Sequence, residues 1–197
     1  MTCTVAVEGA DELVFAADTF WGHDEKSMET TDAKVFSLKY QYGKDETREM
    51  LIGTCGRCRL KQLLKYHFAV PDFPWGHETI SWLTGPFVDS VKDLFEEEDV
   101  LKKENEVAEV YRSSFLVGVH GKAFTISGNF QVTRASHGYA AVGAGYQYAL
   151  GALSAMKSNK DILWDKTKRS AKLAVSAAAE HSPSVRLPVR YQTLGKQ

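Results

Sequence analysis

The sequence has few cysteines and almost no net charge, and both properties narrow the class of protein. Its 197 residues include only 3 cysteines, too few for a disulfide framework and typical of a reducing compartment. The 24 basic residues nearly balance the 25 acidic ones, so the formal net charge at pH 7 is −1. This balance gives no bulk attraction to nucleic acid or to an anionic membrane, and we expect neither as a partner.

Long apolar runs are also missing, which argues against a membrane protein. The stretch 138–156 carries no charged residue, but it contains four glycines and several tyrosines. We therefore expect a strand, a glycine turn and a half-buried helix there instead of a membrane span. The first residues lack a basic segment followed by an apolar core, so we expect no secretory signal and a cytoplasmic location.

Signatures of metal and cofactor sites are incomplete. The six histidines are scattered singly, and His77-Glu78 lacks the second histidine of a zinc-binding helix because Ser81 stands in its place. Cys55 and Cys58 form a CxxC pair that could support redox chemistry, but no βαβ pattern precedes it. We therefore expect no metal ion and no organic cofactor.

The apolar content, 44% of the residues, is enough to bury a substantial core, and we expect a single domain over 1–197. Apolar or alternating runs predict strands at 4–7, 13–17, 34–40, 50–54, 115–119, 123–127, 139–142 and 185–194. Helical spacing predicts helices at 57–67, with Lys61 and Lys65 on the outer face, and at 78–82, 87 to about 110, and 168–180. The turn-rich link 8–11 predicts that 4–7 and 13–17 form a hairpin, and 120–122 predicts a second hairpin of 115–119 with 123–127. Pro188 favours an edge position for the last strand. This order of elements is typical of an α+β domain.

Thr2 offers a nucleophile if Met1 is removed, which a small second residue permits. The chain would then begin with a threonine whose free α-amine lies beside its own hydroxyl. A threonine hydroxyl is a weak nucleophile and needs an adjacent base, which an N-terminal amine can supply. An α-amine has a pKa of about 7.7–8.0, so a useful fraction is unprotonated near neutral pH. Cys3 is the rival nucleophile, exposed if cleavage occurs one residue later.

Asp18 and Lys34 follow Thr2 at successive intervals of 16 positions. With Thr2, these spacings resemble the β-type subunits of the proteasome family, most closely the HslV-like threonine peptidases. In that family an aspartate and a lysine follow a mature N-terminal threonine at these distances, and the match is ungapped from Thr2 to Val35. The resemblance implies that Thr2 is the nucleophile, that Lys34 favours its ionised hydroxyl, and that Asp18 positions Lys34. If Cys3 were the first residue instead, its distances to Asp18 and Lys34 would no longer match those of the family.

A second block, 143–152, resembles the glycine turn and following helix of the same family. The family pattern G-S-G-x-x-Y-A-L-x-A is matched at Gly143, Gly145, Tyr148, Ala149, Leu150 and Ala152. Ala144 stands where the family has a serine whose hydroxyl assists proton handling beside the threonine. This departure motivates an alternative, a catalytically weak or inactive proteasome-like scaffold or binding subunit. An N-terminal-nucleophile amidase acting on small molecules is a third reading.

The resemblance also implies a fold and a substrate pocket. The fold is the four-layer αββα sandwich of N-terminal-nucleophile hydrolases. The amide of Gly56, at the predicted strand-to-helix turn, would stabilise the tetrahedral oxyanion, although a glycine there could simply relieve a tight turn. The pocket would be lined by Trp21, Asp32, Phe36, Gly53 and Arg57. Trp21 and Phe36 as apolar walls predict cleavage after apolar or aromatic residues, and Asp32 could pair with Arg57.

Partners follow from the same resemblance. The substrate would be a peptide or an unfolded protein, the subunits would form a homo-oligomeric ring, and an ATP-dependent unfoldase is a further possible partner. Rings need heterologous interfaces that close on themselves. The apolar helix faces at 88–95 and 148–155 are candidates for such an interface, and each could equally belong to the core.

Overall fold

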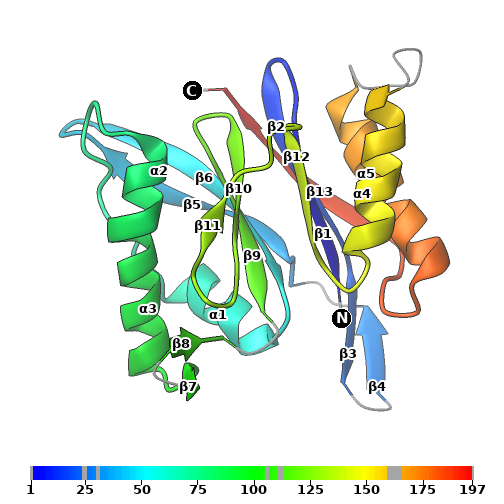
Figure 1. Cartoon of the computed structure of the whole chain (residues 1–197), viewed down its shortest axis with the longest axis horizontal. Helices are drawn as coiled ribbons and strands as arrows, with labels where there is room; N and C mark the ends of the chain where they lie inside the picture. The colour runs from blue at the N-terminus through cyan, green and yellow to red at the C-terminus, as the bar shows by residue number, and fades with distance from the viewer. Residues whose placement is uncertain are drawn as a thin grey trace.

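Two antiparallel β-sheets lie at the centre of the structure, and helices cover their outer faces (Figure 1). The computed structural model describes residues 2–23, 26–29, 32–104, 107–110, 113–158 and 166–196. The first sheet has the order β12 (Tyr139–Gly143), β1 (Cys3–Glu8), β2 (Glu12–Asp18) and β13 (Val189–Gly195). The second has the order β11 (Val132–Thr133), β10 (Lys122–Ile126), β9 (Ser114–Val119), β6 (Glu46–Cys55) and β5 (Val35–Tyr42). Two hairpins stand apart from the sheets, β3 (Phe20–His23) with β4 (Lys26–Glu29) and β7 (Lys102–Glu104) with β8 (Val107–Glu109).

Helices form the two outer layers. On the side of the second sheet lie α1 (Cys58–Tyr66), α2 (Thr79–Trp82), the π-helical turn η1 (Leu83–Phe87) and α3 (Val88–Glu97). On the side of the first sheet lie α4 (Tyr146–Ser158) and α5 (Thr167–His181) (Figure 1). Within the described parts of the chain, no helix is long and apolar enough to cross a membrane.

Three apolar clusters hold these layers together. One joins the second sheet to its helices and includes Leu63, Trp82 and Phe115. One fills the space between the sheets and includes Phe15, Leu51 and Leu116. One joins the first sheet to α4 and α5 and includes Val5, Leu153 and Val175. Full burial of one such side chain contributes about 1.5–3 kcal/mol, so these contacts dominate the stability. The prediction of a mixed chain of strands and helices is confirmed, and both main sheets prove to be antiparallel.

The position of β1 determines what surrounds Thr2. β1 pairs with β2 on one side, where Thr4 lies opposite Ala17, as the predicted hairpin requires. On its other side β1 pairs with β12, where Cys3 lies opposite Gly143. Thr2 is therefore flanked by the end of β2 on one side and by the glycine turn after β12 on the other.

One predicted helix is shorter than expected. The structure ends α3 at Glu97, whereas the sequence pattern extends the helix to about residue 110. Asp99 has a φ of 52°, a left-handed conformation that interrupts a right-handed helix. The acidic run 96–99 also lies at the helix C-terminus, where the helix dipole disfavours negative charge. The chain then continues as the β7–β8 hairpin.

Candidate active site

Thr2 is held by close backbone contact with the glycine turn. Its carbonyl oxygen accepts a hydrogen bond of 3.4 Å from the amide of Gly145. Gly143 has a φ of 96°, and a Cβ at this position would lie only 2.3 Å from the same Thr2 oxygen. A side chain at 143 would therefore displace Thr2, which explains why glycine is needed at this position.

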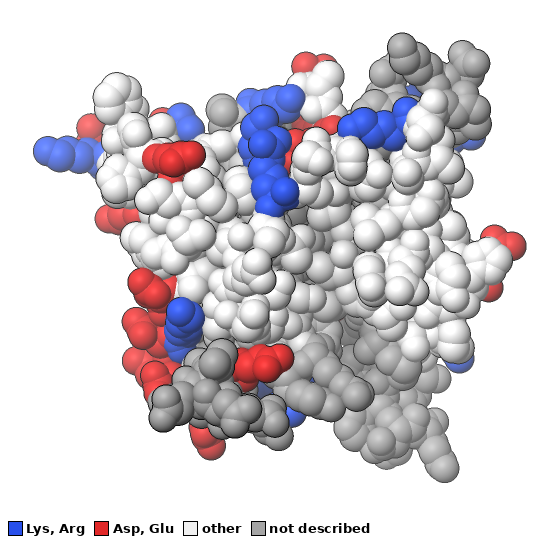
Figure 2. Space-filling model, in the orientation of Figure 1, with Lys and Arg blue, Asp and Glu red and all other residues white. Residues whose placement is uncertain are grey.

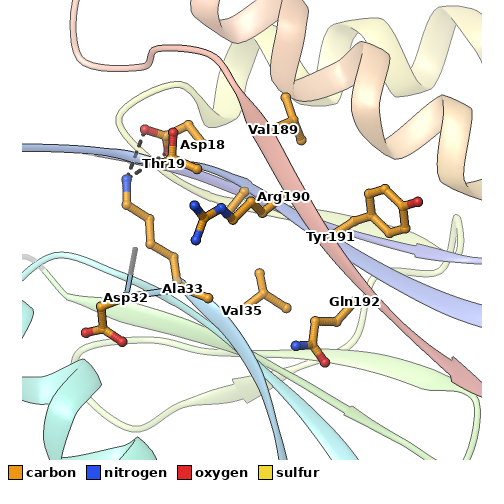
Figure 3. A pocket seen from close by; sticks show the side chains of 11 residues that line it. Asp18, Thr19, Asp32, Ala33, Val35, Val189, Arg190, Tyr191 and Gln192 are labelled. Atoms are coloured by element: carbon orange, nitrogen blue, oxygen red, sulfur yellow. Dashed lines mark hydrogen bonds and ion pairs between the residues drawn. The ribbon is translucent and has the colours of Figure 1, made fainter. Parts of the chain in front are cut away.

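The Asp18 carboxylate connects the backbone after Thr2 to the side chain of Lys34. Its Oδ1 atom accepts hydrogen bonds from the Cys3 amide at 2.9 Å and from Lys34 Nζ at 3.0 Å. Its Oδ2 atom accepts from Lys34 Nζ at 2.9 Å (Figure 3) and from the Phe20 amide at 3.2 Å. Asp18 and Lys34 are both buried, 2% and 8% exposed, so the pair is shielded from solvent. The two residues predicted to support the nucleophile therefore lie together next to it.

Burial changes the acidity of Lys34. Removal from water lowers the pKa of its ammonium group, and the attraction of Asp18 offsets part of this effect. The lysine therefore releases a proton more readily than an exposed one. Its backbone is fixed as well, because the Thr54 amide and hydroxyl both donate to the Lys34 carbonyl, at 2.9 and 3.2 Å.

A small hollow of about 50 Å³ is lined by three of the predicted catalytic residues, Thr2, Lys34 and Gly56, but not by Asp18. Its lining residues are Thr2, Trp21, Lys34, Thr54, Cys55, Gly56, Arg57, Cys58 and Lys61. Gly56 lies between β6 and α1, at the strand-to-helix turn that the sequence predicts, and its φ of 96° suits glycine. Gly56 and Thr2 thus face the same space, an arrangement that an oxyanion-binding amide requires.

Trp21 and Arg57 line this hollow, whereas Phe36 and Gly53 do not. Phe36 is buried in the cluster between the second sheet and its helices. A Cβ on Gly53 would lie 2.7 Å from Thr4 Cγ2, so position 53 faces the space between the two sheets. Side chains alternate faces along a strand, and the next residue, Thr54, is the one that reaches the hollow.

Asp32 lies beside the hollow and is held by two lysines of α1. Lys61 Nζ is 2.6 Å from one carboxylate oxygen of Asp32, and Lys65 Nζ is 2.8 Å from the other. Burial would raise the pKa of Asp32, but the two ammonium groups outweigh this effect and lower it. Lys61 is only 5% exposed, so the prediction that it lies on an outer face is wrong. Periodicity placed Lys61 on the polar face, and only the fold brings that face against Asp32.

Cys3 is unsuited to be the nucleophile in this position. Its side chain has no exposed surface, and burial, followed by the nearby Asp18 charge, raises the pKa of the thiol to about 12. A thiol that stays protonated is a poor nucleophile. Cys55 and Cys58 are free thiols. Among the described residues, no three His, Cys, Asp or Glu side chains gather as a metal site would need.

A larger hollow of about 330 Å³ adjoins the same buried pair. Asp18 and Lys34 both line it, with Asp32 and residues of β13 (Figure 3). Arg190 extends from β13 into this space, and Gln192 lies further along the same strand (Figure 3). No local pattern in the sequence indicates this hollow, because β13 reaches it only through pairing with β2, more than 170 residues earlier in the chain.

Comparisons with known proteins extend these observations. No protein-family model matches the sequence, and no curated protein matches it either. Among solved structures, Thiobacillus denitrificans BPH in complex with epoxomicin has 20% sequence identity over 100% of both chains and a TM-score of 0.78. The eukaryotic HslV of Trypanosoma brucei has 16% identity over 98% of this chain and 99% of its own, with a TM-score of 0.64. A helical assembly of Anbu from Pseudomonas aeruginosa has 16% identity over 98% and 81%, with a TM-score of 0.65. The chain therefore shares a proteasome-like fold.

Proposed function

We propose that this chain is a threonine-type endopeptidase subunit of the N-terminal-nucleophile hydrolase class. The observation that carries the proposal is the buried Asp18–Lys34 pair, which is tied to the Cys3 amide and borders the hollow that contains Thr2. A buried ion pair is a poor source of stability, because desolvation costs about as much as the attraction returns. Its place beside Thr2 therefore favours a chemical role.

The proposed reaction begins once removal of Met1 frees the α-amine of Thr2. The amine accepts the hydroxyl proton, directly or through a water, while Thr2 Oγ attacks the carbonyl carbon of the scissile peptide bond. The Lys34 charge favours the developing alkoxide, and the Gly56 amide donates to the oxyanion. The proton passes to the leaving amine as the peptide bond breaks, leaving an acyl ester on Thr2. Water then hydrolyses this ester, with the α-amine again acting as base.

Two measurements on the purified protein test this proposal. Intact mass spectrometry should show a chain that begins at Thr2, and a fluorogenic peptide assay should show turnover with an acyl-enzyme burst. Thr2→Ala should abolish turnover, whereas Thr193→Ala, an exposed threonine on β13, should not. Retained Met1, or unchanged turnover in Thr2→Ala, would overturn the mechanism.

We also propose that the subunit assembles into a closed homo-oligomer through α4. Tyr146 and Tyr148 on this helix are 42% and 44% exposed, and the surrounding surface carries little charge (Figure 2). The other candidate face is excluded, because Val88, Val91 and Phe95 of α3 are buried in the chain's own core. Light scattering should give a large particle, and a stable monomer at micromolar concentration would refute the assembly. An unfoldase partner rests on the family resemblance alone.

A non-catalytic scaffold is the second candidate, and Ala144 is the observation that favours it. This residue is exposed between the two glycines that contact Thr2, where the family serine would stand. A protein that begins at Thr2 and assembles, yet gives no burst with peptides, would fit this role. Turnover of small acyl amides without turnover of peptides would instead indicate an amidase.

A further inference from the structure

We infer that the hollow beside Thr2 accepts an acidic side chain, so that cleavage follows aspartate or glutamate. This inference rests on the proposed function, because it takes Thr2 as the attacking group. It replaces the expectation of apolar specificity, which depended on Trp21 and Phe36 as facing walls. Phe36 is buried in the cluster between the second sheet and its helices, so of those two walls only Trp21 borders the hollow.

The charge of the hollow is the first argument. Three cationic side chains, Lys34, Arg57 and Lys61, line it. Among the described residues that line it there is no aspartate or glutamate. Cys55 adds no negative charge, because burial raises the pKa of its thiol and keeps it protonated. All of the charged side chains among the described lining residues are therefore cations.

The balance of charges around the hollow is the second argument. Asp18 neutralises Lys34 through two contacts, 2.9 and 3.0 Å long. Asp32 is shared between Lys61 and Lys65, so one carboxylate faces two ammonium groups. These five groups together carry one positive charge in excess. The Lys61 side chain is 6% exposed, and a cation so far from water interacts strongly with an added carboxylate.

The size of the hollow points in the same direction. A space of about 50 Å³ favours a compact carboxylate over an aromatic ring. Lys61 can donate to this carboxylate while it keeps its contact with Asp32, because an ammonium group has three N–H donors. The substrate class is thus an acidic peptide, and Lys61 is the residue that selects it.

Two peptides that differ only in glutamate or glutamine before the scissile bond provide the test. We expect about tenfold or greater preference in kcat/KM for glutamate, as the loss of a hydrogen bond to a charged group usually costs this much. Lys61→Met should reduce the ratio to about one or two. Lys65→Met is the matched control: it removes the same excess charge from the Asp32 pair but leaves the Lys61 donor in the hollow, so the ratio should stay well above that of Lys61→Met.

A binding measurement separates this inference from the proposed chemistry. The Thr2→Ala variant, which cannot cleave, is titrated with acetylated tripeptides ending in glutamate amide or glutamine amide. Tighter binding of the glutamate peptide, lost with Lys61→Met and kept with Lys65→Met, supports the acidic pocket even if no turnover is found. Equal binding of the two peptides, or a preference that survives Lys61→Met, overturns it even if Thr2 proves to be the nucleophile.

Discussion

The Nζ atom of Lys34 lies 2.9 Å from Oδ2 of Asp18, and both side chains are almost fully buried. The same carboxylate accepts the amide proton of Cys3, the residue that follows the proposed nucleophile. Asp18 therefore sets the position of Lys34 and of the start of β1 together. Changes at this carboxylate should affect stability and activity at once.

Asp18→Asn should destabilise the protein and abolish activity. It removes the counter-charge of a buried ammonium group, and breaking a buried pair in this way costs about 3–5 kcal/mol. Denaturant unfolding measures the loss, and the peptide assay measures the activity. The double variant Asp18→Asn/Lys34→Met should recover much of the stability and none of the activity.

The control is Glu46→Gln, which breaks an exposed pair with Arg48 and should change the free energy of unfolding little. A stable and active Asp18→Asn variant would contradict the role assigned to the pair.

Gly143→Ala should disable the site without unfolding the domain. The new Cβ would meet the Thr2 carbonyl oxygen at 2.3 Å, and the φ of 96° is unfavourable for alanine. Peptidase rate and amide exchange at the start of β1 report the displacement. Gly195→Ala in β13 is the control, because nothing lies within 4 Å of its Cβ and its φ is not positive. There alanine should change the stability little and leave activity intact. Equal effects of the two substitutions would rule out the proposed contact.

Ala144→Ser should raise the peptidase rate if Thr2 is the nucleophile. It introduces the hydroxyl that the HslV-like sequence pattern has at this position, in a turn whose glycines contact Thr2. Positioned proton-transfer groups usually contribute about 100-fold or more, and we expect at least about a tenfold gain in kcat here. Ala144→Gly lacks the hydroxyl and serves as the control. A scaffold subunit would stay inactive with either residue.

The free energy of unfolding should fall as the pH rises from about 9 towards 12. The pKa of the Cys3 thiol is about 12 in the folded chain and near 9.0 when unfolded, so the unfolded chain loses this proton first. The stabilisation by the neutral thiol is therefore complete below pH 9 and is lost above it, by about 1.4 kcal/mol per pH unit. Tyr40, whose pKa burial raises to about 12, adds a similar slope above pH 10.

The contribution of Cys3 is the difference between the unmodified protein and Cys3→Ala in denaturant titrations across this pH range. In Cys3→Ala the free energy of unfolding should fall less steeply with rising pH, because the contribution of the thiol is gone. This variant should retain peptidase activity. Identical slopes in the two proteins would mean that the thiol is more accessible to water than the structure shows. Loss of activity in a folded Cys3→Ala protein would indicate that Cys3, and not Thr2, is the nucleophile.

Most of the strands follow from short-range patterns in the sequence. The predicted hairpin 4–7 with 13–17 forms as β1 and β2, and the run 115–127 forms β9 and β10. Pro188 predicts an edge strand, and the strand that follows it, β13, lies at an edge of the first sheet. The end of α3 was not predictable in this way, because the apolar residues after Glu97 fit a helix or a hairpin equally well.

The sequence by itself determined that Thr2, Asp18 and Lys34 have the spacings that resemble those of the HslV-like peptidases. It also determined that adjacent antiparallel strands would bring Thr2 and Asp18 together. Only the tertiary structure decided which side chains border the nucleophile. A shift of one residue reverses the face on which a strand residue lies, so Thr54 reaches the hollow where Gly53 was expected. Lys61 becomes a buried wall of the site because α1 packs beside Asp32, a contact between distant segments that no local pattern records.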